Sequence, residues 1–409
     1  MSSRPAALTT PSRTDSFAHI DMAGFARELE QLRANLDAER GPADYRHLRT
    51  MERLGRLFFW AGLAMAPFAL NPLAIFLISF ATVIRWAMIT HHISHRGYDK
   101  IPGIAPRYTS KGYARGWRRY LDWFDWMHPE AWNQEHNIFH HYYTSEIEDP
   151  DLVEQNVMMI RDYAGPRLVK FMFMLFMACT WKFSYYAPKT LMIWQRVRAR
   201  QRLDVAQRGK LRNVMPSDPQ LDVSYLRMYS PLHRDGRELW LKCLLPYATL
   251  RFVVLPAAFL PLGLSAALTV LATLLLAELA TNIHSFIVIV TNHAGDDLYR
   301  FHAPLQDRNE FYVRQVISSV NFRTGGNLND MLHGWLNYQI EHHIWPDMTM
   351  LQYQKAQPQV QAICAKYGVP YVQQSVWRRL PKLWSIIAGD SSMPAADTSP
   401  AMSTQPSAA

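Results

Sequence analysis

Two long apolar blocks dominate the pattern of hydrophobic and polar positions along the 409-residue chain. The first covers residues 57–89 and is interrupted by the turn dipeptide Asn71-Pro72. The second covers residues 244–290, with a turn expected at Pro261-Leu262-Gly263. Because a membrane-spanning helix needs roughly 20 apolar residues, each block predicts a helical hairpin. We therefore expect an all-α integral membrane protein with about four transmembrane helices in two hairpins.

The charges beside these blocks predict their orientation. Both hairpin turns are uncharged, whereas Arg and Lys flank the outer ends of both blocks, notably over residues 100–119 and 300–314. Positively charged flanks stay on the cytoplasmic side of a membrane. Both hairpin tips should then face away from the cytoplasm, and both chain termini should lie inside, in a multi-pass protein typical of a bacterial inner membrane.

The two ends of the chain differ from the middle. Residues 1–50 form a polar N-terminal segment without the apolar core of a signal peptide, although residues 25–36 have helical periodicity. We assign residues 51–385 to one membrane domain. Residues 386–409, rich in Ser, Ala, Pro and Thr, are predicted to be a disordered tail. A further apolar stretch, residues 169–186, contains two lysines and predicts a helix at the membrane surface.

Charge and hydrophobic content narrow the classes of molecule that this protein can bind. The formal charge of +9 is compatible with nucleic acid, anionic lipid or an acidic protein. The apolar blocks favour membrane lipids and argue against nucleic acid. The cysteines, Cys179, Cys243 and Cys364, are too far apart in sequence for a CxxC motif or an iron–sulfur centre.

Histidines carry the candidate chemistry. Of the 16 histidines, eight lie in three short windows that all fall on the predicted cytoplasmic side, in a histidine-rich helical cap. Residues four apart on a helix share a face, and neutral imidazoles in this number suit iron, copper or zinc. The pattern predicts more than one metal ion. The eight residues are His91, His92, His95, His136, His140, His141, His342 and His343.

A fourth segment adds His293. On a continued helix, this residue would share a stripe with Glu278, Asn282 and Ser285, polar positions that are costly inside a membrane. We predict that His293 is a further ligand. Additional candidates are residues that could support the ligands or join them: His92, Gln339, Asn292, His284, His333 and Asp149. Asp149 could accept the second ring N–H of a bound histidine.

The third window, Gln339-Ile340-Glu341-His342-His343, closely resembles the QxxHH box of membrane fatty acid desaturases, particularly the front-end acyl desaturases. The first two windows are similar to the HxxxH and HxxHH boxes of that superfamily. The resemblance covers residues 50–375. It departs from the family pattern at His92, where Asp is common, and in the second window, which has three residues between its first two histidines instead of two.

The resemblance implies a non-haem di-iron centre that uses O2 and two electrons from a separate donor, of ferredoxin, rubredoxin or cytochrome type with its reductase. The implied reaction introduces a C=C bond into an acyl-lipid, acyl-CoA or acyl-carrier substrate. The implied ligands are His91, His95, His136, His140, His141, His342 and His343, with His293 in the extra position between boxes.

Other functions stay open on sequence alone. The same centre could hydroxylate a lipid or alkane, or decarboxylate a fatty acid oxidatively. A membrane zinc hydrolase would need a catalytic carboxylate motif such as HExxH, which is absent. A metal or lipid carrier would not need histidines from four segments.

Overall fold

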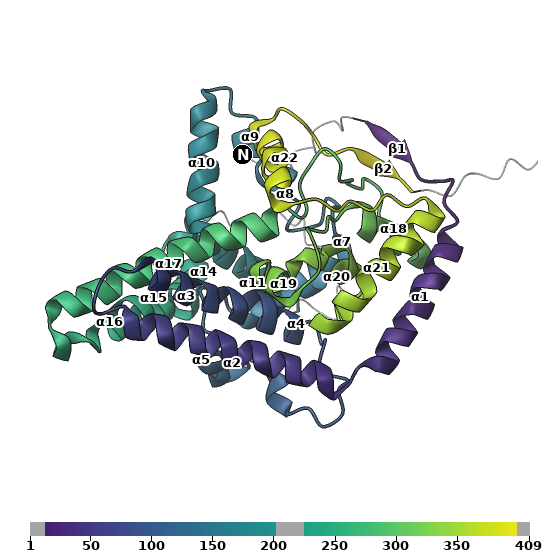
Figure 1. Ribbon diagram of the computed structural model, residues 1–409. Coiled ribbons are helices and arrows are strands. Elements are labelled where there is room, and N and C mark those ends of the chain that lie inside the picture. The colour runs from purple at the N-terminus through teal and green to yellow at the C-terminus, as the bar shows by residue number, and fades with distance from the viewer. Residues whose placement is uncertain (1–12, 202–224, 399–409) are drawn as a thin grey trace, which may run out of the picture.

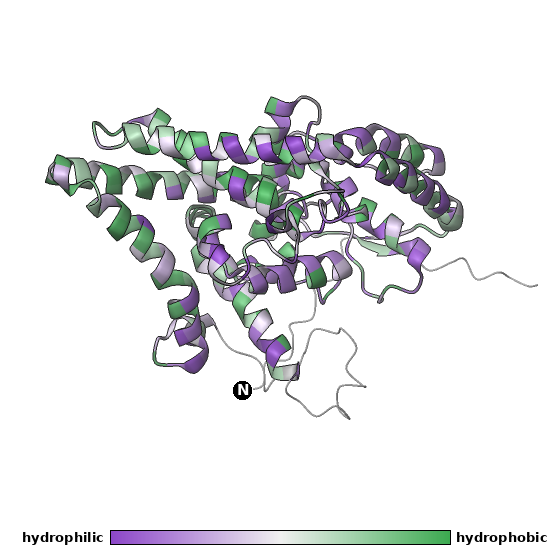
Figure 2. Ribbon diagram, turned by 90° about the horizontal axis from the view of Figure 1, so that it is seen from below, coloured by the Kyte–Doolittle hydropathy of each residue, from purple (hydrophilic) through white to green (hydrophobic). Residues whose placement is uncertain are grey.

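The computed structural model describes residues 13–201 and 225–398, most of which are helical (Figure 1). Long helices form a bundle at one end, and short helices form a cap at the other. Figure 2 shows that the free end of the bundle is predominantly apolar, whereas the opposite end is rich in polar residues. The predicted all-α class is confirmed: the described residues contain two strands of three residues each.

The first hairpin joins α2 (Pro42–Met65) to α3 (Pro72–Val83). Asn71 is the N-cap of α3 and accepts a hydrogen bond from the backbone N–H of Leu73, while Pro72 takes the first helical position. Both residues favour a helix start, so the predicted turn lies where expected. The helix continues without a break through the π-helix η1 (Ile84–Thr90) into α4 (His91–Ser94).

The second hairpin consists of a helical run over residues 234–262 and α17 (Leu264–Val290). Gly263 joins the two arms with φ 105°, a backbone conformation that favours glycine. The first arm alternates α- and π-helical turns: α14 (Arg234–Leu239), η7 (Trp240–Leu244), α15 (Leu245–Thr249), η8 (Leu250–Val254), α16 (Leu255–Ala257) and the 3-10 turn η9 (Leu260–Leu262).

Three of the described helices are long and apolar enough to cross a membrane: residues 72–94, 234–262 and 264–290. The expected fourth span, the first arm of hairpin one, belongs to α2. This helix begins in polar sequence at Pro42 and is not among the three. Its second half still exposes apolar side chains, with Trp60 at 62%. The count of four spans therefore stays a prediction.

Two buried polar side chains of α17, Glu278 and Asn282, have hydrogen-bond partners inside the bundle. Glu278 of α17 accepts hydrogen bonds from the Trp126 indole (2.7 Å) and the Tyr247 hydroxyl (2.9 Å), and lies 3.2 Å from Arg251. Asn282 accepts a hydrogen bond from the backbone N–H of Lys182. Because a buried polar group without a partner is costly, these contacts give Glu278 and Asn282 a structural role, whereas the buried Ser285 hydroxyl has no hydrogen-bond partner among the described residues.

A third long helical run crosses the bundle. It comprises α10 (Arg167–Trp181), the π-helix η5 (Lys182–Tyr186) and α11 (Ala187–Gln201). In Figure 1, α10 projects across the direction of α17, against which it packs. Its apolar side chains Leu168, Phe171 and Phe176 are exposed. This arrangement agrees with the predicted helix at the membrane surface, which stays a prediction.

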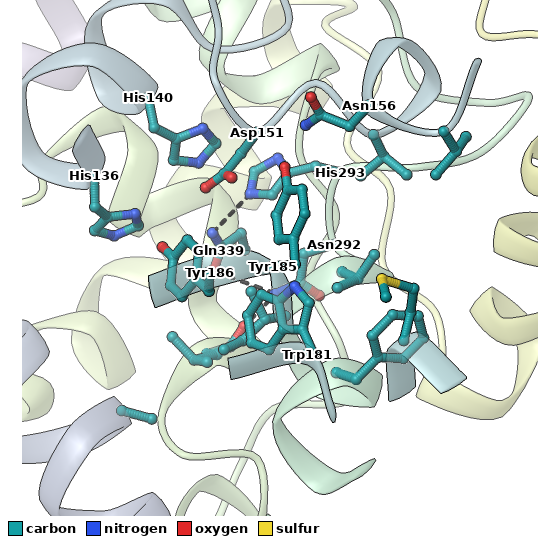
Figure 3. A pocket seen from close by; sticks show the side chains of 18 of the residues that line it. His136, His140, Asp151, Asn156, Trp181, Tyr185, Tyr186, Asn292, His293 and Gln339 are labelled. Carbon is teal, nitrogen blue, oxygen red and sulfur yellow. Dashed lines mark hydrogen bonds between the residues drawn. The ribbon is translucent and has the colours of Figure 1, made fainter. Parts of the chain in front are cut away.

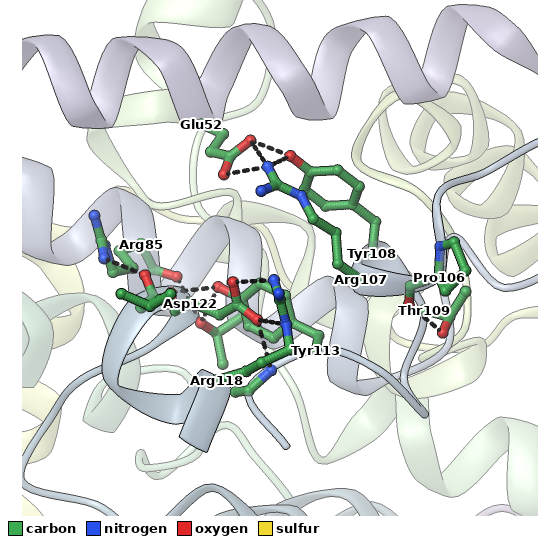
Figure 4. A network of polar contacts seen from close by, with 12 residues as sticks. Glu52, Arg85, Pro106, Arg107, Tyr108, Thr109, Tyr113, Arg118 and Asp122 are labelled. Atoms are coloured by element: carbon green, nitrogen blue, oxygen red, sulfur yellow. Dashed lines mark hydrogen bonds and ion pairs between the residues drawn. The ribbon is translucent and has the colours of Figure 1, made fainter. Parts of the chain in front are cut away.

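A polar network fixes the loop between α4 and the second histidine window (Figure 4). Tyr108 donates a hydrogen bond to Glu52 of α2 (2.5 Å), and Arg107 donates to the same carboxylate (3.2 Å). Further along the loop, Arg118 donates to Asp122 (2.8 Å). The contacts of Tyr108 and Arg107 hold the loop against α2, and the Arg118–Asp122 pair stabilises the loop itself.

Both ends of the described chain lie on the cap. Strand β1 (Thr14–Ser16) pairs in parallel with β2 (Ala395–Asp397), and the backbone N–H of Arg300 bonds to the Pro394 carbonyl. The prediction of a disordered tail from residue 386 is therefore wrong for residues 386–398. Their composition suggested disorder, but backbone pairing and burial of Met393 order them. Residues 399–409 lie outside the described residues.

The remaining described elements are further helices and short helical turns. The N-terminal segment contributes α1, which buries Phe25 and Leu29 and packs on α21. The elements are α1 (Met22–Glu39), η2 (Pro106–Tyr108), η3 (Gly116–Arg118), α5 (Arg119–Asp122), α6 (Pro129–Gln134), η4 (Glu135–His140), α7 (His141–Tyr143), α8 (Val153–Asn156), α9 (Met158–Arg161), α13 (Tyr225–Tyr229), α18 (Arg308–Ile317), α19 (Asn327–Leu332), η10 (Leu336–Tyr338), α20 (Gln339–Ile344), α21 (Met350–Tyr367) and α22 (Val376–Ala388).

Candidate metal centre

The first histidine window is the cap end of a membrane-length helix. His91 and His95 lie at α4, directly after the π-helix η1, whose last bond runs from the His91 N–H to the Trp86 carbonyl. A π-helical turn widens the helix and is common at functional sites. Because the same helix continues into the bundle, these two imidazoles are held on a rigid element.

The second window also lies on a π-helix, which explains its unusual spacing. In η4 the His141 N–H bonds to the His136 carbonyl, five residues earlier. An α-helix places residues three and four apart on one face. Since a π-helical turn takes in about one more residue, His140 and His141 occupy the corresponding positions relative to His136. The extra residue of this window is therefore absorbed by the wider turn.

The third window forms the short helix α20. It is preceded by Trp335, a non-glycine residue in the left-handed region with φ 60°. The Trp335 indole donates a hydrogen bond to the Met350 carbonyl (2.9 Å), which ties the start of this segment to α21. His342 and His343 are both buried.

Five of these histidines form one group, here called the five-histidine site. Their candidate ligand nitrogens all lie within 4.8 Å of one another. The His91 and His136 Nε2 atoms are 3.0 Å apart. That separation equals the distance between adjacent ligands at right angles on metal bonds of about 2.1 Å. The five residues are His91, His95, His136, His141 and His342.

The other three form a second group, the three-histidine site: His140, His293 and His343. The Nε2 atoms of His293 and His343 are 3.2 Å apart. The structure brings His293 next to His140 and His343, while its role as a ligand stays a prediction, and the expected continued helix is wrong. Helix α17 ends at Val290, and His293 lies beyond it in a turn that brings the ring back toward the cap.

The donor atoms fit a metal. Ring nitrogens of His95, His141 and His342 are buried without a hydrogen-bond partner among the described residues. Burial lowers the pKa of each of these three groups well below 6.5, so their rings are neutral and keep a lone pair for a ligand bond. Buried nitrogens without partners are costly unless a cation takes them. Eight imidazoles in two groups therefore indicate metal binding.

Outer hydrogen bonds orient several of these rings. His140 Nδ1 donates to Asp149 Oδ1 (2.9 Å), as predicted for Asp149. Although burial acts in the opposite direction, Asp149 raises the pKa of His140. His343 Nδ1 donates to Gln315 Oε1 (3.1 Å), and His342 Nδ1 donates to the Tyr353 hydroxyl (3.1 Å). Such partners fix the ring orientation and direct Nε2 toward the metal.

Gln339 and Asn292 lie beside the three-histidine site. The Gln339 side-chain amide is 2.9 Å from His293 Nε2, and Asn292 donates to Gln339 Oε1 (3.3 Å). Both sequence candidates thus reach the centre. The supporting roles of Gln315 and Tyr353 were missed because neither residue lies near a histidine window in a recognisable motif.

Three other candidates lie outside both groups. His92 Nδ1 donates to the Met88 carbonyl (2.7 Å), one turn back on its own helix. His284 bonds to the Leu332 carbonyl (2.7 Å), and His333 bonds to the Asn329 carbonyl (2.8 Å). Each therefore has a backbone partner, and the prediction of an additional ligand is not supported at these positions.

An apolar cavity of about 130 Å³ ends at the metal centre (Figure 3). Its walls come from the π-helix η1, helices α10 and α17 and the segment around η5. Aromatic and Met side chains dominate the lining, and polar groups gather where it meets the histidines. The apolar part includes Trp86, Phe173, Met177, Trp181 and Phe286, and the polar part includes His136, His140, Asp151, Asn292, His293 and Gln339.

Buried metal-binding histidines at the end of an apolar cavity, on apolar helices, define a membrane-associated metalloprotein. A family model described as fatty acid desaturase matches residues 107–375. The chain belongs to the fatty acid desaturase family and is an oxidoreductase.

Individual relatives agree with this assignment. The NADPH-dependent stearoyl-CoA 9-desaturase of Mycobacterium tuberculosis is 25% identical over 393 residues, which cover 91% of this chain and 82% of that protein. The Delta(8)-fatty-acid desaturase of Euglena gracilis is 35% identical over 104 residues, covering 25% of this chain and 24% of the relative. The acyl-lipid (9-3)-desaturase of Physcomitrium patens is 34% identical over 89 residues, which cover 22% of this chain and 16% of the relative.

Proposed function

We propose that this protein uses O2 and two external electrons to introduce a double bond into an acyl chain, at a non-haem di-iron centre. One iron would be held by the five-histidine site and the other by the three-histidine site. The observation that carries the proposal is the convergence of eight buried imidazoles, in two groups, at the end of an apolar cavity.

Bound iron would supply the oxidising power to remove hydrogen from an unactivated methylene, a reaction beyond any acid or base side chain. The protein's own part is positioning. Trp86, Phe173 and Phe286 line a cavity that an acyl chain can fill, which would place one methylene pair near the histidines. The same apolar walls exclude water from the site. Hydrogen-bond partners such as Asp149 hold the imidazole rings in the orientation that directs their free nitrogens toward the metal.

The acyl group is proposed to arrive on a lipid, on coenzyme A or on an acyl carrier, and the names of the relatives include the first two of these. A separate ferredoxin-, rubredoxin- or cytochrome-type protein with its reductase would deliver the electrons. We place the protein in a bacterial inner membrane, with the cap and both termini in the cytoplasm. The uncharged hairpin tips and basic flanks support this orientation.

The test is the lipid profile of a host that expresses the wild type beside His342→Ala, analysed by mass spectrometry with double-bond localisation. We expect an acyl species two mass units lighter with wild type alone. His333→Ala is the matched control, because His333 lies near the third window but outside both sites, and it should retain activity. A product sixteen mass units heavier would show that the protein hydroxylates its substrate instead of desaturating it. Equal profiles for wild type and His342→Ala would refute the proposal.

A further inference from the structure

We infer that Asp151 is a ninth, anionic ligand, which faces both metal sites from the cavity side. This inference rests on the proposed di-metal centre and goes beyond its eight histidines. Asp151 follows the second histidine window after the Asp149-Pro150 dipeptide and lines the apolar cavity.

The position of Asp151 relative to the histidines is the first argument. A carboxylate oxygen of Asp151 and ring nitrogens of His136 and His140 all lie within 4.8 Å of one another. His136 belongs to the five-histidine site and His140 to the three-histidine site. In the view of Figure 3, Asp151 lies among His136, His140 and His293. Among the described residues, Asp151 is the one carboxylate that falls in such a group with the histidines.

Charge balance is the second argument. Eight neutral imidazoles add no negative charge, so two divalent cations would bring four positive charges into a buried site. Buried charge is costly unless it is compensated nearby. Asp149 is already engaged, because its two oxygens accept from His140 Nδ1 and from the Ser145 N–H. Glu341 points elsewhere, toward Asn321 and the Tyr371 hydroxyl.

The closest alternative is that Asp151 binds the polar end of a substrate, since Asp151 lines the cavity together with Asn156. A substrate-binding role predicts a change in KM with normal metal content. A ligand role predicts a change in the metal centre without any substrate. The two are therefore separable on the substrate-free protein.

The experiment compares wild type, Asp151→Asn and the exposed control Asp162→Asn, each purified as the full chain with iron. Iron per chain is measured after incubation with increasing chelator, and the Mössbauer spectrum is recorded without substrate. We expect Asp151→Asn to lose iron at about 10- to 100-fold lower chelator concentration. Its spectrum should change at both iron positions, while Asp162→Asn behaves as wild type.

Each outcome bears on one proposal. An unchanged chelator profile and spectrum for Asp151→Asn, with two irons in the wild type, would overturn the ligand role and leave the proposed function intact. A wild type that retains no iron under any preparation would instead refute the di-iron function itself. Asp151→Glu keeps the charge and should recover part of the iron retention. Failure of both variants to fold, judged by gel filtration of the metal-free protein, would assign Asp151 a structural role and also overturn the inference.

Discussion

The five-histidine site and the three-histidine site differ in what orients their imidazole rings. In the five-histidine site, His342 donates to the Tyr353 hydroxyl, whereas His91, His136 and His141 each have a ring nitrogen without a hydrogen-bond partner among the described residues. In the three-histidine site, each ring has an outer partner: Asp149 for His140, the Ser318 carbonyl for His293 and Gln315 for His343. The first site relies on ligand number and rigid helices. The second has few ligands, and hydrogen bonds orient each of them.

The largest expected difference follows from ligand number. His343→Ala leaves two histidines in its site, whereas His95→Ala leaves four in the other. We expect iron in His343→Ala to fall from about two per chain to about one, while His95→Ala keeps most of its iron. Activity should drop by more than about 100-fold in both variants, since the loss of an outer partner alone costs 10- to 100-fold.

The measurement is iron per chain by inductively coupled plasma mass spectrometry on freshly purified protein. His284→Ala serves as the control, because its ring bonds to the Leu332 carbonyl outside both sites. Equal iron loss in His95→Ala and His343→Ala would show that ligand number does not distinguish the sites, and the comparison would fail.

A smaller effect is expected at Gln339, which is next to the three-histidine site and 2.9 Å from His293 Nε2. Gln339→His would add an imidazole where ligands are few, so this site should retain iron at up to about tenfold higher chelator concentration. Gln339→Ala should shift retention in the opposite direction. Chelator titration followed by iron analysis measures both changes.

Gln354→His provides the matched control, because Gln354 donates to Asp330 and Asp330 belongs to neither histidine group. If Gln339→His and Gln339→Ala change retention in the same direction, the side chain acts by packing and not as a potential ligand. The distinction sharpens the comparison, since it tests whether the three-histidine site has an open position.

The sequence predicted which histidines cluster better than it predicted the residues that orient them. Helical spacing placed His91 and His95 in one group, whereas His136 and His140 belong to different sites, and His293 reaches its group from a turn beyond α17. The spacing could not show the π-helix around His140, because its extra residue is defined by hydrogen bonds and not by composition. Gln315 was equally hidden, since α18 reaches the site only through tertiary packing.

The fold was likewise predictable where local residues determine it and not where distant segments pair. Both hairpin turns were predicted from local residues, Asn71-Pro72 and Gly263, whose backbone preferences are strong. The pairing of β2 with β1 was missed because it joins positions at opposite ends of the chain. Local chemistry thus predicts turns and ligand faces, whereas long-range contacts need the three-dimensional structure.

The smallest expected effect concerns the loop that supplies Asp149 to the three-histidine site. Glu146 in this loop lies 2.9 Å from Arg314 of α18, the helix that also carries Gln315. Burial raises the pKa of Glu146 to about 7, and Arg314 only partly opposes this shift. The folded chain therefore holds this proton more tightly than the unfolded chain, whose glutamate has a pKa near 4.5.

Stability should then decline as pH rises from about 4.5 to about 7, because the folded state must release a proton that the unfolded state has already lost. Glu146→Gln removes this contribution and leaves Arg314 paired with Glu310 (2.6 Å). We expect the difference in Tm, Glu146→Gln minus wild type, to increase by a few degrees at most between pH 5 and pH 8. Thermal unfolding in detergent at each pH measures this difference. A difference that stays constant with pH, or that falls, would mean that the charged pair stabilises the loop. The three-histidine site would then depend on a salt bridge as well as on hydrogen bonds.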